Sequence, residues 1–145
     1  MNNEQSGTYA MINPQIDNDP AKRQGEIGLI VDANLERDDI WVSFGRDKVG
    51  LYSTNALMVL NKHEQISQNA MDKRFEITGA DFKKLMEISL LTQSGRPEKM
   101  KAALEMAGSN ETLLKNSTST LQDRLGLVLN YEAAQSKDMA IARGR

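Results

Sequence analysis

The chain has 145 residues, a net charge of -2 and no cysteine. This length admits one compact domain or two small ones, and the lack of cysteine excludes disulfides and thiolate chemistry. No apolar run approaches the ~18 residues needed to cross a bilayer, and the first residues lack the basic and apolar regions of a secretory signal. We therefore expect a soluble, cytoplasmic protein that does not span a membrane.

Alternating apolar residues predict antiparallel strands in the first half of the chain. A short edge strand is expected at 9–12, and a long strand follows it at about 27–35. That long strand would bury one face, formed by Ile27, Leu29, Val31, Ala33 and Leu35. The next strand would bury Ile40, Val42 and Phe44. A third strand near 49–53 and a last one at 57–60 complete the pattern.

The spacing of the second and third strands predicts a hairpin. If residues 45–48 form its loop, Phe44 pairs with Val49. Trp41 then stands opposite Tyr52, on the face that does not carry Ile40. Such an aromatic cross-strand pair stabilises a hairpin by up to ~1 kcal/mol relative to small residues.

Beyond residue 61 the apolar spacing becomes helical. Thr78 resembles the start of a capping box and Gly95 a helix end, so a helix is expected between them. Pro97 opens a second helix that stops at Gly108. A short helical turn is expected around 113–114, and a last helix begins near 119 or 120.

The strand-rich part resembles an SH3-like small barrel of the KOW type. In that superfamily a Gly-x-x-Gly opens a strand, a hairpin follows, and a short turn leads into a last strand. Gly25 and Gly28 stand before Leu29–Val31, and residues 56–60 provide the last strand. The resemblance covers about residues 7–60 and does not extend to the helical half. Nucleic-acid-binding barrels of this type usually carry basic loops, whereas these loops hold Asp38, Asp39 and Asp47, in departure from that pattern.

We accordingly expect an α+β protein in which an SH3-like small antiparallel barrel precedes three or four short α-helices. The expected divisions are a disordered N-terminus at 1–6, the barrel at 7–60, a linker at 61–77, a helical domain at 78–136 and a charged tail at 137–145. Within the linker, Ile66, Ala70 and Met71 hint at a helical turn or two.

The residues that could carry chemistry are few. The single histidine, His63, lies in a polar segment and is interpreted as a solvated side chain rather than a catalytic one. The acidic pairs at 17/19 and 38/39 stand in turn contexts, where Asp bonds to its own backbone. One imidazole without thiolates cannot complete a structural zinc site, and no phosphate-binding glycine motif occurs. We expect neither an enzyme nor a bound metal or cofactor, and no small-molecule substrate.

Trp41 and Tyr52, with Ser43 on the same strand as Trp41, are the candidate protein-binding residues. Tryptophan and tyrosine are enriched at interaction hot spots. The alternative is that the aromatic pair packs beneath the helical half, because the helices need an apolar surface to cover. We favour this intramolecular alternative.

A second candidate surface is basic and would lie on the helical half. It comprises Arg96, Lys99, Lys101, Lys115 and Arg124. Interspersed glutamates make a solvated helix face the better interpretation than a surface that follows phosphates.

The sequence thus favours a non-catalytic protein-interaction module. It would act as an adaptor or as a structural subunit of a larger assembly, for example in a phage or mobile element, through a protein partner or self-association. The alternative is a nucleic-acid-associated accessory protein that uses the basic helical half.

Overall fold

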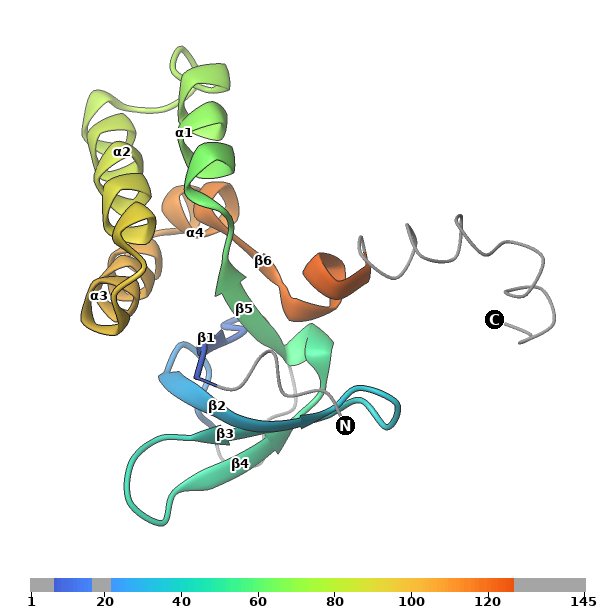
Figure 1. Cartoon of the computed structure of the whole chain (residues 1–145). Helices are drawn as coiled ribbons and strands as arrows, with labels where there is room; N and C mark the ends of the chain where they lie inside the picture. The colour runs from blue at the N-terminus through green and yellow to red at the C-terminus, as the bar shows by residue number, and fades with distance from the viewer. Residues whose placement is uncertain (1–6, 17–21, 127–145) are drawn as a thin grey trace, which may run out of the picture.

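The computed structural model describes residues 7–16 and 22–126 and combines a curled sheet with a layer of helices (Figure 1). The α+β class expected from the sequence is confirmed. The N-terminus at 1–6, the tail at 137–145 and the end of the expected last helix lie outside the described residues.

The described strands form one antiparallel sheet in the order β4-β3-β2-β1-β5-β6. Their bounds are β1 Tyr9–Ile12, β2 Ile27–Asn34, β3 Asp39–Ser43, β4 Val49–Tyr52, β5 Leu57–Leu60 and β6 Thr118–Thr120. The sheet is open, with β4 at one edge and β6 at the other, so the expected closed barrel is not confirmed. The added strand β6 comes from the helical half and pairs with β5, which extends the sheet beyond the expected strands.

Strand β2 does not bury the single face that its alternation predicted. The pairing of β2 with β3 shifts register between Ile30 and Asp32, where a bulge interrupts the ladder. Ile30 and Ala33 are buried in the same core, whereas Val31 between them is exposed. Because a bulge inserts one residue, side chains on either side of it exchange faces. The prediction of one buried odd-numbered face over 27–35 is therefore wrong.

The hairpin of β3 and β4 differs by one residue from its predicted register. The Phe44 N–H donates to the Lys48 carbonyl at 2.7 Å, so the loop spans residues 45–47 and is one residue shorter than expected. Trp41 consequently pairs with Leu51, and Ile40 pairs with Tyr52. A slip of one residue moves a side chain to the opposite face. Trp41 and Tyr52 thus lie on different faces, contrary to the prediction.

Two apolar cores lie on opposite sides of the central strands. The first fills the concave side of the sheet and takes residues from each of the strands β1–β5; its members are Ala10, Ile12, Ile30, Ala33, Ile40, Val42, Tyr52, Ala56, Leu57, Val59 and Leu121. The second joins Met11 and Leu60 of the sheet to buried residues of the helices, including Leu85 and Leu104. Strands β1 and β5 therefore contribute to both cores.

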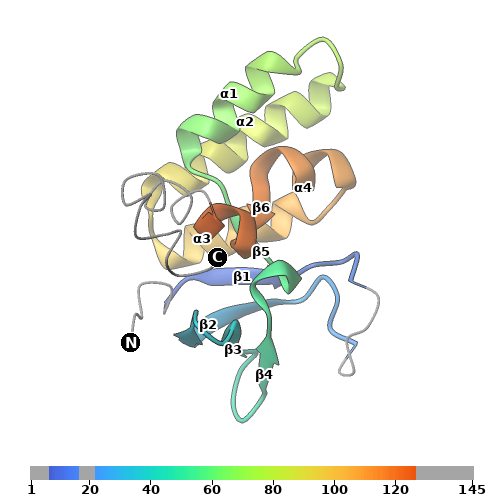
Figure 2. The same cartoon turned by 90° about the vertical axis from the view of Figure 1, so that its right-hand side faces the viewer.

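The helices stack on the side of the sheet away from β4, as the two views show (Figures 1 and 2). They are α1 His63–Asp72, α2 Gly79–Ser94, α3 Pro97–Ala107 and α4 Glu111–Ser117, and residues 121–126 are also helical. The predicted ends of α2 are confirmed: the Thr78 hydroxyl accepts a hydrogen bond from the Asp81 N–H, and Gly95 is left-handed with φ 71°.

The segment 61–77, expected to be a linker, contains α1. Ile66 and Ala70 are spaced four residues apart on one side of this helix and are fully buried in the second core. The Ser89 hydroxyl of α2 donates to the His63 carbonyl at 2.8 Å. Helix α1 is thus packed into the helical layer. None of the helices in the described part of the chain combines the length and apolar character that a bilayer crossing requires.

Candidate protein-interaction surface

Large apolar side chains gather on the outer face of strands β2, β3 and β4. Val31 is 45% exposed, Trp41 41%, Val49 50% and Leu51 49%. We call these residues the outer patch. Single exposed apolar residues are ordinary, but neighbouring ones on one face are typical of an interaction surface.

The strand register brings the outer patch together. Trp41 stands directly opposite Leu51 on β4 and next to Asp32, the residue that follows Val31, on β2. Val49 lies two residues before Leu51, so both point to the same face of β4. Directly opposite side chains in an antiparallel pair have Cβ atoms about 5 Å apart. Trp41 and Leu51 therefore form adjoining parts of one surface.

Tyr52, one of the predicted binding residues, lies in the core instead. Its side chain is only 8% exposed, and its ring meets Phe44 edge-on with centroids 6.3 Å apart. The Arg23 guanidinium lies over the Phe44 ring, 4.5 Å from its centre. A Cβ on Gly50 would stand 2.7 Å from the Tyr52 ring, so the glycine leaves room for the ring. Tyr52 therefore stabilises the sheet and is not presented to a partner.

Ser43, the third predicted residue, lies beside the outer patch but is engaged in the hairpin loop. It pairs with Val49, and its hydroxyl lies 3.4 Å from both the amide nitrogen and the carbonyl oxygen of Gly45. Gly45 has φ 121°, a conformation that favours glycine. The serine side chain thus supports the loop from which Val49 emerges.

Trp41 is not covered by the helices, contrary to the interpretation that we favoured. The helical layer packs on Met11 and Leu60 of the central strands, whereas Trp41 is on the outer face of the sheet near its β4 edge. Sequence reasoning identified Trp41 but missed Val31, Val49 and Leu51. These three residues can be recognised only when the bulge in β2 and the register of the β3–β4 hairpin are known. For the hairpin register, the available signal in the sequence was Gly45 in the loop.

The edge of the sheet next to the outer patch carries backbone groups that face away from β3. The Phe44–Lys48 bond makes that pair hydrogen-bonded, and bonded and non-bonded pairs alternate along an antiparallel ladder. Gly50 and Tyr52 therefore bond to β3, whereas the N–H and C=O groups of Val49 and Leu51 point outward. No hydrogen bond to these outward groups is found within residues 7–16 and 22–126.

Charged side chains stand at both ends of the outer patch. Arg46 and Lys48, with Asp47 between them, lie in the β3–β4 connection. At the opposite end, Asp39 begins β3 and Asp38 accepts a hydrogen bond from the Thr54 N–H at 2.8 Å. The loop end is therefore more basic and the turn end more acidic.

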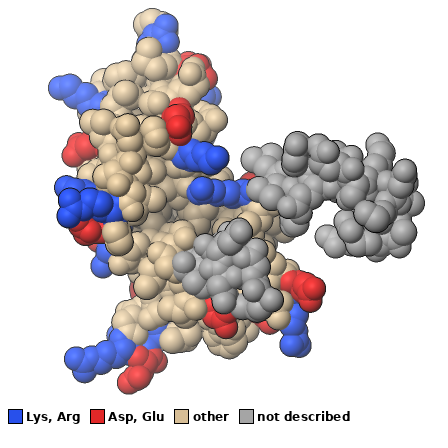
Figure 3. Space-filling model, in the orientation of Figure 1, with Lys and Arg blue, Asp and Glu red and all other residues tan. Residues whose placement is uncertain are grey.

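The predicted basic residues do not gather on one face. Lys99 and Lys101 are two positions apart on α3, which separates their directions by about 200° around the helix. Arg96 pairs with Glu98 at 3.0 Å, Lys115 is on α4, and Arg124 donates to the Leu60 carbonyl. On the face shown in Figure 3, blue and red side chains are interspersed, and no continuous basic stripe is visible there.

His63 begins α1 and is the only imidazole of the chain. Its Nε2 atom lies 3.4 Å from an oxygen of Glu64, and its side chain is about one third exposed. Among the described residues no group of three His, Asp or Glu side chains is placed to hold a metal ion.

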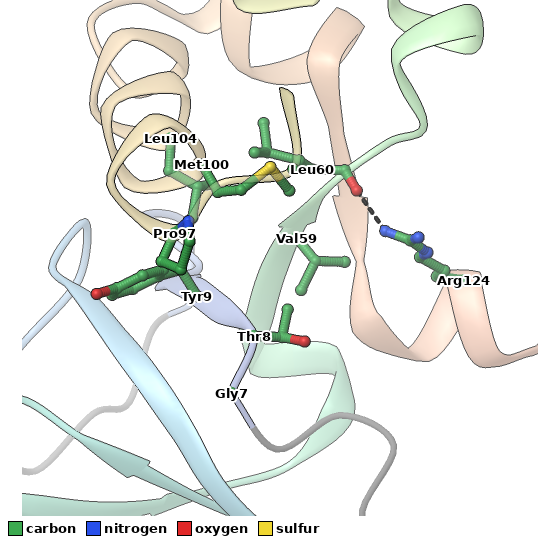
Figure 4. Close-up of a pocket in the computed structure, with 10 residues that line it drawn as sticks. Gly7, Thr8, Tyr9, Val59, Leu60, Pro97, Met100, Leu104 and Arg124 are labelled. Atoms are coloured by element: carbon green, nitrogen blue, oxygen red, sulfur yellow. Dashed lines mark hydrogen bonds between the residues drawn. The ribbon is translucent and has the colours of Figure 1, made fainter. Parts of the chain in front are cut away.

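A cavity of about 260 Å³ lies between β1, β5 and the start of α3 (Figure 4). Tyr9, Val59, Pro97 and Met100 give it apolar walls, and the guanidinium of Arg124, bonded to the Leu60 carbonyl, stands at its side. Gly7, where the described chain begins, forms part of the lining.

Comparisons with protein-family models, curated proteins and solved structures find no match to this chain.

Proposed function

We propose that this protein is a non-catalytic interaction module, an adaptor or a structural subunit of a larger assembly, which binds a protein partner through the outer patch. The observation that carries the proposal is the exposure of Val31, Trp41, Val49 and Leu51 on neighbouring strands. Burying apolar surface contributes roughly 25 cal/mol per Å². A tryptophan amid aliphatic side chains is a frequent centre of such interfaces.

The layout of the molecule supports this assignment of roles. The concave core holds the sheet together and the second core attaches the helices, so neither core needs the outer patch for folding. The exposed side chains of Trp41, Val49 and Leu51 belong to neither core and can contribute to an interface. The two cores can then hold the strands that carry the outer patch in a fixed arrangement.

We further propose that strands β1–β5 are of the SH3-like type, as a curled open sheet. Two observations support this. A short turn, the 3-10 segment Thr54–Ala56, leads from β4 into the last strand β5, as in that superfamily. Each of these five strands contributes to one concave core.

Selection of binding peptides from a display library tests the interaction even while the natural partner is unidentified. Peptides selected on the wild-type chain are measured against Trp41→Ala and Leu51→Ser. Loss of a hot-spot contact worth about 2 kcal/mol weakens binding by more than tenfold. Leu90→Ser is the matched control, because Leu90 is 66% exposed on α2, away from the sheet.

The expected result is at least a tenfold loss for both patch variants and no change for Leu90→Ser. Far-UV circular dichroism confirms that each variant is folded. Peptides that bind all three variants equally would show that the outer patch is not the binding surface.

A further inference from the structure

Strand β4 is an edge strand whose outward backbone groups could pair with a strand of a second chain. Val49 and Leu51 direct their peptide groups away from β3, and the same two residues expose their side chains on the outer patch. Strand β4 contains no proline and no charged residue, the devices with which many edge strands prevent pairing. An added strand would gain backbone bonds and apolar contacts at the same residues.

We propose that the partner of the outer patch is a second copy of this chain, whose β4 pairs antiparallel with β4 about a two-fold axis at Gly50. This inference rests on the proposed function and specifies its partner. With Gly50 opposite Gly50 of the second copy, Val49 stands opposite Leu51 in both directions. Each of these two pairs exchanges both of its N–H···O=C bonds, so every outward peptide group of Val49 and Leu51 is satisfied.

The side chains fit this register. Antiparallel pairing about an axis normal to the sheet continues the sheet, so the outer patches of the two copies lie on the same face. Val49 of each copy then contacts Leu51 of the other, a cross-strand aliphatic pair. The facing position, Gly50, has no side chain to obstruct the close approach of a non-bonded pair. Trp41, beside Leu51, adjoins the joined surface.

The charges at the two ends of the patch are complementary under the same symmetry. Arg46 of one copy comes opposite Thr54 of the other, whose N–H is bonded to Asp38. The more basic loop of each copy therefore meets the more acidic turn of its partner, twice per dimer. Opposite charges at such positions favour one register and orientation of association. A second copy supplies the ladder, the aliphatic pairs and these charges together.

Sedimentation velocity between about 1 µM and about 1 mM chain tests the pairing, because small interfaces of modest affinity associate in this range. The wild type is expected to shift from monomer to dimer. Leu51→Pro removes the outward N–H and the side chain without removing a bond to β3, and Leu51→Lys is the alternative if the proline variant does not fold. Either is expected to weaken dimerisation at least tenfold, whereas Leu90→Lys leaves it unchanged.

A charge exchange tests the proposed orientation. The double variant Arg46→Glu with Lys48→Glu, and separately Asp39→Lys, should each dimerise at least tenfold more weakly than the wild type. When these two variants are mixed in equal amounts, the loop of each variant is complementary in charge to the turn of the other. Heterodimers should therefore form. A mixture no better than its components would overturn the register.

The outcomes separate this inference from the proposed function. A wild type that stays monomeric throughout overturns self-pairing, but selected peptides that still depend on Trp41 would leave the interaction surface in place. A dimer that survives Leu51→Pro or Leu51→Lys in folded protein uses another face, which also overturns self-pairing. A monomer for which no patch-dependent peptide can be selected contradicts both.

Discussion

Strands β1 and β5 bury both of their faces, whereas β3 and β4 bury only one. In β1, Ile12 enters the concave core while Met11 enters the helical core. In β3, Val42 enters the concave core while Trp41 on the other face is exposed. The helices therefore divide the sheet into a part whose apolar residues are used for folding and a part whose outer residues are not.

This difference separates apolar residues that are buried in a core from apolar residues of the same type that are exposed. Leu57 and Leu51 are both strand leucines, yet the first is fully buried and the second is about half exposed. What distinguishes them is the face of the sheet on which they lie: Leu57 enters the concave core, whereas Leu51 lies on the outer face, which is exposed at β4. Substitutions on the two kinds of face should therefore lower the free energy of unfolding by different amounts. The difference should be largest where a large ring is removed.

Tyr52→Ala should reduce the free energy of unfolding by about 3 to 5 kcal/mol, because it removes a buried ring that packs on Phe44. Trp41→Ala should change it by less than about 1 kcal/mol, because the outer face stabilises little. Urea denaturation followed by circular dichroism measures both variants. Equal losses would mean that Trp41 is packed as tightly as Tyr52 and that the hairpin register is wrong.

Leu57→Ala should cost about 2 to 5 kcal/mol, since it leaves a cavity in the concave core. The matched variant Leu51→Ala should stay within about 0.5 kcal/mol of the wild type. Both are measured by urea denaturation at low chain concentration, where a dimer would not add to stability. A large loss for Leu51→Ala under these conditions would assign this side chain to folding.

The sequence predicted most of the elements but not the faces that they bury. Thr78 and Gly95 mark the ends of α2 because their roles are local: a hydroxyl that caps an amide, and a residue that adopts positive φ. The α+β class likewise follows from the change of period near residue 61. Local physical chemistry was sufficient for these features.

The errors arose where a single residue changes a register. The bulge after Ile30 and the loop closed by Phe44 each shift the alternation by one position. The loop includes Asp47 with φ 52°, a conformation that the alternation of apolar and polar residues does not predict. Trp41 could therefore be singled out by its type, but its neighbours on the outer patch depended on pairing between strands. The short apolar spacing of α1 was too weak to predict a packed helix.

Gly28→Ala should cost about 1 to 3 kcal/mol, because β2 approaches β3 closely at this position. An added Cβ would stand 2.5 Å from the Val42 side chain and 2.8 Å from the Ser43 carbonyl oxygen. Gly79→Ala is the control, since no atom beyond its chain neighbours and its own helix backbone lies within 4 Å of its added Cβ, and alanine favours the helix. Thermal unfolding compares the two, and a neutral Gly28→Ala would mean that the strands can separate without loss.

Thr78→Ala should lower the free energy of unfolding by about 1 kcal/mol, because it removes the hydroxyl that caps α2. This variant also tests whether the two parts of the molecule unfold together. Trp41, the only tryptophan, reports on the sheet by its fluorescence, while circular dichroism at the helical band reports on α1–α4. Because Met11 and Leu60 join the sheet to the helical core, we expect both signals to shift to lower denaturant by the same amount. A shift confined to the helical signal would instead show that the helices unfold as a separate unit, and the contacts of β1 and β5 with the helices would then contribute little to stability.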